Sequence, residues 1–136
     1  MAKVSFVGFQ EKVEIPEGFQ LLKIEENLES SLRKDQLFSL LSDVQKLSLW
    51  IHQVLSFDSR PGGKIIFEDG TAATCTSFVL GKEVSFIADS FGNFTAKVIK
   101  GKGHNSIAIN FAILTDAGEK KKEDILEIIN RLKAQL

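Results

Sequence analysis

The residues best suited to hold a soft metal ion, or to act as a nucleophile and its base, are His52, His104 and Cys75. Zinc ligands usually come in closely spaced pairs, whereas these three fall in a predicted helix end, a turn and a strand. A Cys–His nucleophilic pair would also need a third orienting group and donors for the oxyanion. We therefore predict no metal, no cofactor and no catalytic residue, and expect Cys75 to be a small buried strand residue.

Polar residues that could do acid–base chemistry are few, and no two carboxylates are placed by pattern to share a site. The candidates are Thr74, Thr76, Asp89, Asn110 and His52. Gly101-Lys102-Gly103 is not followed by a helix start, so it lacks the amide cradle of a phosphate loop. The run 120–122 of three lysines is interpreted as the solvated start of a helix. These patterns favour a protein that is not an enzyme.

The composition is that of one globular domain: 136 residues, 43% hydrophobic and 26% charged. With 17 basic and 18 acidic residues, the chain has no excess charge to hold a phosphate backbone, so nucleic acid is not an expected partner. A single cysteine favours a reducing compartment, and we predict a cytoplasmic protein. No stretch approaches the ~20 apolar residues of a membrane span. Eleven Phe, one Trp and no Tyr leave the aromatic surface almost without hydroxyl groups, which suits apolar filling better than polar recognition.

The first half of the chain predicts one long strand followed by two short helices. Leu22 and Ile24 alternate with charged residues in a strand from Phe19 to Glu26. Residues 1–18 form an N-terminal extension, which is either an extra edge strand or an ordered tail. Apolar residues spaced three and four apart over 37–51 indicate a helical face, and Asp35 and Asp43 are the predicted N-caps of two helices.

The second half predicts six strands and a closing helix. The strands are 54–58, 64–68, 71–80, 83–89, 94–100 and 106–114, and the turns between them are too short for parallel crossovers. Ile125, Ile129 and Leu132 lie on one stripe of a helix from Glu119 to Leu136, which would cover one face of the sheet. Residues 19–136 thus form a single α+β domain with the order β, α, α, six β, α.

Two segments carry a family resemblance. Residues 37–50 place a hydrophobic pair in a helix, then Asp43 before a second short helix that ends in Trp50; Arg60-Pro61-Gly62-Gly63 follows the next strand. Together they resemble the activator of heat shock protein 90 ATPase homologue group of the SRPBCC (START, or birch-pollen-allergen-like) superfamily. The resemblance covers about residues 19–136, with Val44 where the group usually has proline.

The resemblance implies a helix-grip fold, in which a curved antiparallel sheet of about seven strands wraps around a long C-terminal helix. It also implies an apolar cavity between sheet and helix, with Trp50 near its mouth. We expect this cavity to have the volume usual for small-ligand sites, about 300–1,000 Å³, if the sheet stays open there. The predicted ligand-binding residues are Trp50, Phe57, Phe67, Phe86, Phe94, Phe111 and Ile129. The same side chains would serve equally as core filling, and the sequence leaves both interpretations open.

Three functions are compatible with these observations. The first is non-enzymatic binding of a small hydrophobic or amphipathic ligand in the cavity. The second is a protein-interaction module, similar to the co-chaperone domain that activates heat shock protein 90, whose partner would be a chaperone or another protein. The third is a polyketide cyclase or dehydratase-like enzyme, which would need polar side chains inside the cavity.

Overall fold

The computed structural model describes residues 3–6 and 15–136, with side chains from residue 15 onward. Its elements, in chain order, are β1 (Lys3–Phe6), β2 (Gln20–Ser30), α1 (Lys34–Ser42), α2 (Val44–Leu47), β3 (Val54–Phe57), β4 (Lys64–Phe67), β5 (Ala72–Val79), β6 (Glu83–Ala88), β7 (Gly92–Lys100), β8 (Asn105–Thr115) and α3 (Gly118–Lys133). From β2 onward this is the order predicted from the sequence.

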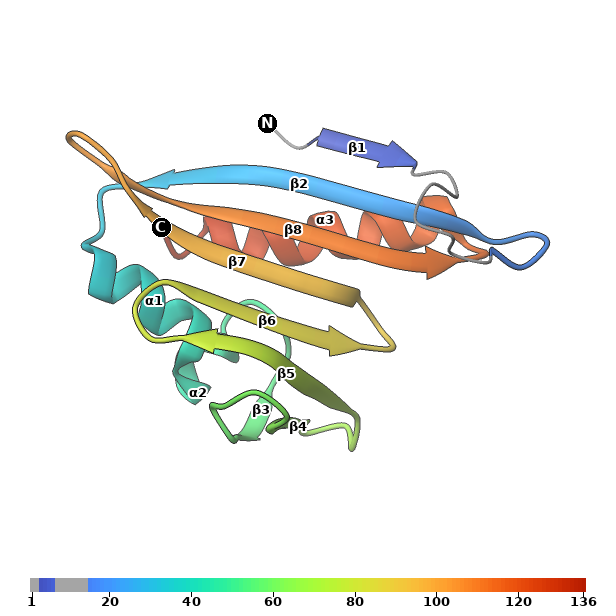
Figure 1. Ribbon diagram of the computed structural model, residues 1–136, viewed down its shortest axis with the longest axis horizontal. Helices are drawn as coiled ribbons and strands as arrows, with labels where there is room; N and C mark the ends of the chain where they lie inside the picture. Colours follow the sequence, from blue (N-terminus) through green and yellow to red (C-terminus); the bar gives the residue numbers. More distant parts are fainter. Residues whose placement is uncertain (1–2, 7–14) are drawn as a thin grey trace.

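The strands form one antiparallel sheet in the order β1-β2-β8-β7-β6-β5-β4-β3 (Figure 1). Strands β3 to β8 are a meander, as their short turns predict. Strand β2 joins the sheet beside β8, because the chain passes through α1 and α2 before the meander begins. At the other edge of β2, residues 3–6 pair with it as β1, from Lys3 opposite Glu25 to Phe6 opposite Leu22. Residues 7–14 of the predicted N-terminal extension lie outside the described residues.

Strand β2 is longer than its sequence pattern indicates. The predicted strand ended at Glu26, whereas the observed one continues to Ser30 and pairs with β8 along its whole length, from Gln20 opposite Thr115 to Ser30 opposite Asn105. The burial alternation simply continues through Leu28 and Ser30, which face the core. The full-length pairing makes β2 and β8 the platform on which α3 lies.

Asp43 separates α1 from α2, as predicted. Its Oδ1 accepts the N–H groups of Gln45 (2.9 Å) and Lys46 (3.3 Å), which would otherwise be unsatisfied at the start of α2. The prediction for the start of α1 is wrong by two residues, since the N-cap is Arg33. The Gln36 side chain accepts the Arg33 N–H at 2.9 Å, while Asp35 lies inside the first turn.

Helix α3 packs against one face of the sheet and buries the stripe of Ile125, Ile129 and Leu132. It begins at Gly118, after the two-residue connection 116–117 that follows β8. It ends at Lys133, three residues earlier than predicted. Helix α1 covers the part of β6, β7 and β8 that α3 leaves uncovered. The core lies between these helices and the sheet. In the described part of the chain, no helix is long and apolar enough to cross a membrane.

Candidate functional site: the cleft beside helix α3

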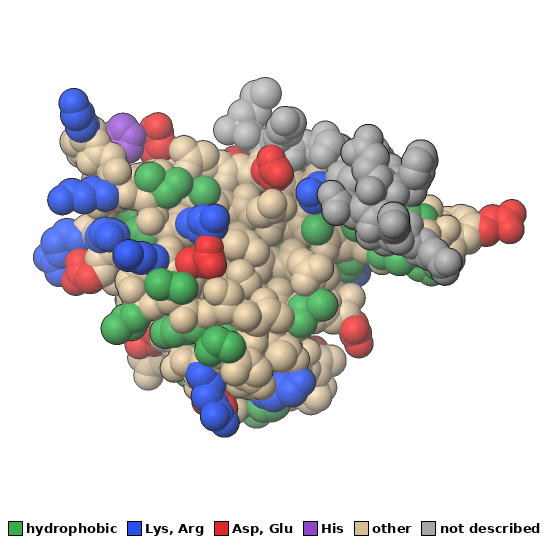
Figure 2. All heavy atoms as spheres, in the orientation of Figure 1, with side chains coloured by type: hydrophobic (Ala, Val, Ile, Leu, Met, Phe, Trp, Pro, Cys, Tyr) green, Lys and Arg blue, Asp and Glu red, His purple; other side chains and the backbone are tan. Residues whose placement is uncertain are grey.

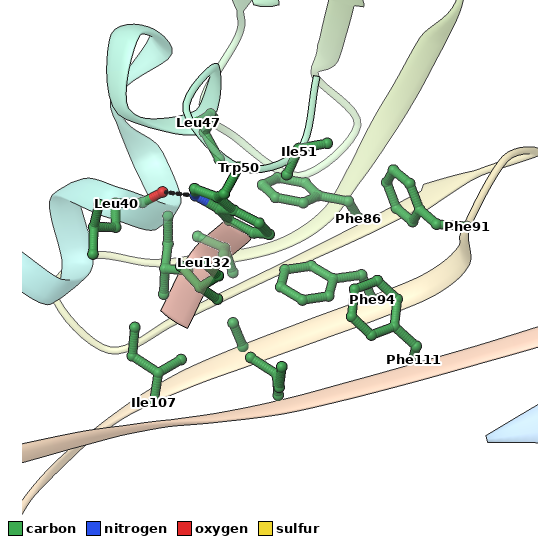
Figure 3. Close-up of a cluster of buried hydrophobic side chains, with 14 of the residues drawn as sticks. Leu40, Leu47, Trp50, Ile51, Phe86, Phe91, Phe94, Ile107, Phe111 and Leu132 are labelled. Carbon is green, nitrogen blue, oxygen red and sulfur yellow. Dashed lines mark hydrogen bonds between the residues drawn. The ribbon is translucent and has the colours of Figure 1, made fainter. Parts of the chain in front are cut away.

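Trp50 is fixed in the core at the point where the chain leaves α2. Its side chain is 1% exposed, and its indole Nε1 donates to the carbonyl of Leu40 in α1 at 2.8 Å (Figure 3). This bond satisfies the only polar atom of the ring, so burying the indole carries no desolvation penalty for an unpaired N–H. Trp50 therefore ties the two short helices to the sheet, and it contacts Phe94 of β7 at 5.6 Å between ring centroids.

Arg131 of α3 binds the backbone of the same segment, residues 50–51, after α2. Its Nε donates to the Trp50 carbonyl at 3.0 Å and its Nη2 donates to the Ile51 carbonyl at 3.2 Å. Its Nη1 pairs with Glu127, one turn earlier on α3, at 2.9 Å. The planar guanidinium thus bridges a carboxylate and two backbone carbonyls, which a lysine could not do with the same geometry.

The phenylalanine rings form a continuous row across the inner face of the sheet. Phe94 lies at its centre: it stacks on Phe86 at 5.9 Å and contacts Phe111 at 4.8 Å (Figure 3). From Phe86 the row continues through Phe57. Five of the predicted ligand-binding residues, Trp50, Phe57, Phe86, Phe94 and Phe111, are therefore brought together as the sequence suggested.

These rings fill the space that was predicted to be open. The gap among them and α3 is too narrow to hold a water molecule, so a cavity of 300–1,000 Å³ is not present there in the described structure. The gap is lined by Trp50, Ile51, Phe91, Phe94, Phe111 and Ile128. The prediction of an open volume was wrong because large side chains enter from the sheet, from α3, from the segment after α2 and from the β6–β7 turn at once, and close packing is the rule for protein interiors.

An open cleft of about 330 Å³ lies directly outside this gap. Its apolar lining consists of Ile51, Phe67, Phe91 and Ile128, and three of these, Ile51, Phe91 and Ile128, also line the closed gap. Helix α3 forms one wall, and the segment after α2 and the β4–β5 and β6–β7 turns form the rest. The cleft and the closed gap therefore adjoin at these three side chains.

The polar rim of the cleft is organised in pairs. His52 Nε2 lies 3.1 Å from Asp69 Oδ2, and the ring of His52 also contacts Phe67. The hydroxyl and the backbone N–H of Thr71 donate to Asp69, and these bonds, with His52 beside them, hold the pKa of Asp69 below its usual range. On α3, Lys120 similarly lowers the pKa of Asp124 through a 2.9 Å bond.

Lys121 is the exception on this rim. Its Nζ donates to the carbonyl of Ser90 in the β6–β7 turn at 3.0 Å, and no carboxylate pairs with it within residues 15–136. The rim thus offers one ammonium group with donor capacity to spare, since a lysine has three N–H donors. An acceptor that entered the cleft could take up one of them.

Two residues at the site were missed by the sequence analysis. Phe91 was assigned to a turn, yet it is buried and its ring contacts Phe94 and Phe111. The signal that could have found it is Gly92: its φ is +72°, and a Cβ there would lie 2.3 Å from the Ala112 carbonyl oxygen. Only a residue without a Cβ fits so close to β8, and such a residue directly follows Phe91. Arg131 carried no signal in the sequence, because its partners are backbone carbonyls.

The other two predicted ligand-binding residues, Phe67 and Ile129, lie outside the aromatic row. Phe67 faces the cleft beside His52, away from the ring contacts of Trp50, and Ile129 is buried at 1% exposure on the core side of α3. Of the acid–base candidates, only His52 lines the cleft. Thr74 and Asn110 lie on the outer face of the sheet, while Thr76 and Asp89 are exposed.

The soft-metal candidates do not converge either. His104 pairs with Glu29 at 3.3 Å at the far end of the sheet, and Cys75 is buried in β5 as expected. Among the described residues, no three His, Cys, Asp or Glu side chains are grouped so as to hold an ion.

Comparison with known proteins identifies the fold. No protein-family model and no curated protein matches the sequence. Among solved structures, CalU16 from Micromonospora echinospora matches with a TM-score of 0.67 and 10% identity, over 99% of this chain and 84% of that one. Protein BH1534 from Bacillus halodurans matches with a TM-score of 0.67 and 13% identity, over 83% and 95%. The Aha1 dimer from Colwellia psychrerythraea matches with a TM-score of 0.62 and 11% identity, over 79% and 91%.

At these identities the matches establish the architecture alone. The antiparallel sheet, the two short helices after β2 and the C-terminal helix on the inner face agree with the predicted α+β fold. The chain has a helix-grip fold.

Proposed function

We propose that this protein binds a small amphipathic ligand without catalysing its conversion. The ligand's polar group would lie at the rim of the cleft beside α3, and its apolar part would pass between Ile51, Phe91 and Ile128 toward the aromatic row. The observation that carries this proposal is the sharing of those three side chains between the open cleft and the closed gap. A cleft of about 330 Å³ lies at the lower end of the range usual for small-ligand sites.

The rim suggests which polar group would bind. Asp69, Asp124 and Glu127 each already have a basic partner, whereas Lys121 bonds to a carbonyl. The preferred ligand therefore carries a hydrogen-bond acceptor such as a carboxylate, a sulfonate or a hydroxyl group. Of the acid–base candidates predicted from the sequence, only His52 lines this rim, which supports a binding role over the cyclase or dehydratase alternative. The single buried cysteine supports a cytoplasmic location.

Titration with the dye anilinonaphthalene sulfonate, which joins an apolar ring system to an anionic group, tests the proposal. Trp50 is the only tryptophan, so energy transfer from it reports dye near the aromatic row. We expect saturable transfer in the parent protein. Ile128→Glu should weaken binding by about tenfold or more, because a carboxylate in the apolar lining must be desolvated. Lys121→Met should weaken it as well.

Two matched controls distinguish the site from general effects on α3. Asn130→Glu adds the same charge at an exposed position, and Lys122→Met removes the neighbouring ammonium group. Both should bind dye like the parent protein. Absence of saturable transfer up to the solubility of the dye, or equal losses in the controls, would contradict the proposal.

A closed interior also favours a second candidate, a protein-interaction module. The aromatic row leaves no room for water, so function could lie on the outside of the fold. One structural match is Aha1, described as a dimer, which is consistent with a place in the heat shock protein 90 ATPase activator homologue group. The partner would then be a chaperone or another protein. A failed dye titration together with a dimer in analytical ultracentrifugation would favour this candidate.

A further inference from the structure

One end of the sheet gathers lysines around exposed apolar side chains (Figure 2). This end is built from the β5–β6 turn and the β7–β8 loop, which lie on the same side of the molecule because β5 and β7 run toward it (Figure 1). Hydrogen bonds join the pieces. The Val98 N–H donates to the Lys82 carbonyl at 2.8 Å, and Asn105 Nδ2 donates to the Leu32 carbonyl before α1 at 3.0 Å. The first bond fixes the β5–β6 turn against β7, two residues before Lys100, and the second fixes the start of β8 against the segment before α1.

Three lysines give this surface a positive charge: Lys82, Lys100 and Lys102, all exposed. The nearby carboxylates are already engaged, Glu83 with Lys97 at 3.5 Å and Glu29 with His104 at 3.3 Å. In residues 15–136, none of the three lysines has an ion-pair partner. Since the whole chain carries a net charge of only −1, this local excess reflects an uneven distribution of charge, not a basic protein.

Apolar side chains project among these lysines. Leu80 is 80% exposed at the tip of a tight turn, which the Lys82 N–H closes on the Val79 carbonyl at 2.9 Å. Val79 and Ile99, on the outer face beside it, are 45% and 46% exposed. Exposed apolar groups clustered with charge commonly mark a contact surface. An acidic peptide would be held best in a groove, but these residues project from turns and line none of the clefts described above.

We propose that this end of the sheet binds the surface of an anionic lipid membrane. Leu80 would enter the headgroup layer, Val79 and Ile99 would follow at its edge, and the ammonium groups of Lys82, Lys100 and Lys102 would pair with lipid phosphates. Lysine stems suit this arrangement, since their methylene groups lie along apolar surface while the charge stays at the headgroups. Charge and a small apolar anchor act together in reversible membrane binding. The proposal is independent of the cleft beside α3.

Co-sedimentation with lipid vesicles tests it on the full chain. We expect the parent protein to pellet at low salt with vesicles of phosphatidylglycerol and phosphatidylcholine, and to stay in solution with phosphatidylcholine alone. Binding should fall as salt rises, because ions screen charges at the surface. The double variant Lys100→Glu/Lys102→Glu should lower partitioning by roughly 30-fold or more, from the usual contribution of each basic residue at an anionic surface. Leu80→Ser should lower it by roughly fivefold or more.

Matched controls carry the same changes elsewhere. Lys46→Glu/Lys122→Glu reverses two lysines on α2 and α3, and Leu55→Ser removes a leucine that is 61% exposed on β3. Both should partition like the parent protein, and circular dichroism should show that every variant is folded. Equal losses in variants and controls, or a parent protein that does not pellet with the anionic vesicles, would overturn the proposal. If the parent instead binds immobilised polyglutamate and Lys100→Glu/Lys102→Glu does not, the same lysines serve an acidic protein and the membrane assignment is wrong.

Discussion

Replacing Gly92 by alanine tests how the β6–β7 turn directs Phe91 into the site. Gly92 has φ +72°, and a Cβ at this position would lie 2.3 Å from the Ala112 carbonyl oxygen and 2.6 Å from the Ile113 Cβ. Gly81, in the β5–β6 turn, is a matched control. Its φ is +77°, but a Cβ there would meet nothing within 4 Å. The two substitutions share the backbone penalty and differ in the steric one.

The shared penalty is about 1–2 kcal/mol for placing an L-residue at positive φ. It is partly offset by about 0.4–1 kcal/mol, because alanine restricts the unfolded chain more than glycine does. Gly81→Ala should therefore lower the free energy of unfolding by about 1 kcal/mol. Gly92→Ala must also displace the β8 backbone, and forcing extra atoms into a packed region costs about 1–3 kcal/mol. We expect a total loss of about 2–4 kcal/mol.

Urea denaturation followed by circular dichroism measures both losses, provided the slope of the transition is unchanged. The near-ultraviolet spectrum of Gly92→Ala should also change, because Phe91 would move relative to Phe94 and Phe111. Equal destabilisation by the two substitutions would refute the reasoning, since it would mean that the turn does not press against β8.

Two further predictions concern the core. Ile129→Ala should lower the free energy of unfolding by about 2–5 kcal/mol, since Ile129 is 1% exposed and its truncation opens a cavity; Asn130→Ala, at an exposed position beside it, should change stability by less than about 0.5 kcal/mol. A urea midpoint for Ile129→Ala equal to that of the parent would show that α3 does not pack as described. Burial raises the pKa of the Cys75 thiol and keeps it out of reach, so Ellman's reagent should modify it only in urea. Rapid modification of the folded protein at neutral pH would contradict its placement inside β5.

The fold was predictable because its signals are local. Alternation along β8, turn residues such as Asp69-Gly70 and the cap at Asp43 each act within a few residues, and all are found in the structure. The errors fall where a distant segment decides. Strand β2 extends to Ser30 because β8 offers a partner along its whole length. The N-cap of α1 is a different kind of error, because it depends on a local contact: Arg33 takes this position since the Gln36 side chain accepts its N–H.

The site was less predictable, because its geometry depends on contacts between remote elements. The inward direction of Phe86, Phe94 and Phe111 follows from strand alternation, so their grouping could be foreseen. Whether they enclose a cavity or fill it depends on how closely Trp50 approaches Phe94, and no pattern in the sequence encodes that distance. The bond from Arg131 to the Trp50 carbonyl likewise joins residues 81 positions apart.

The anchoring of these side chains indicates where the wall between the cleft and the aromatic row would open for the proposed ligand. Trp50 is held at its indole by Leu40 and at its carbonyl by Arg131, so displacing it would break hydrogen bonds that the core cannot replace. Phe91 is held by apolar and ring contacts alone, beside a glycine whose backbone already lies in the left-handed region. Moving Phe91 exchanges one set of dispersion contacts for another and leaves no polar group unpaired. A ligand's apolar part would therefore replace the ring of Phe91, and Trp50 would remain as the fixed inner wall.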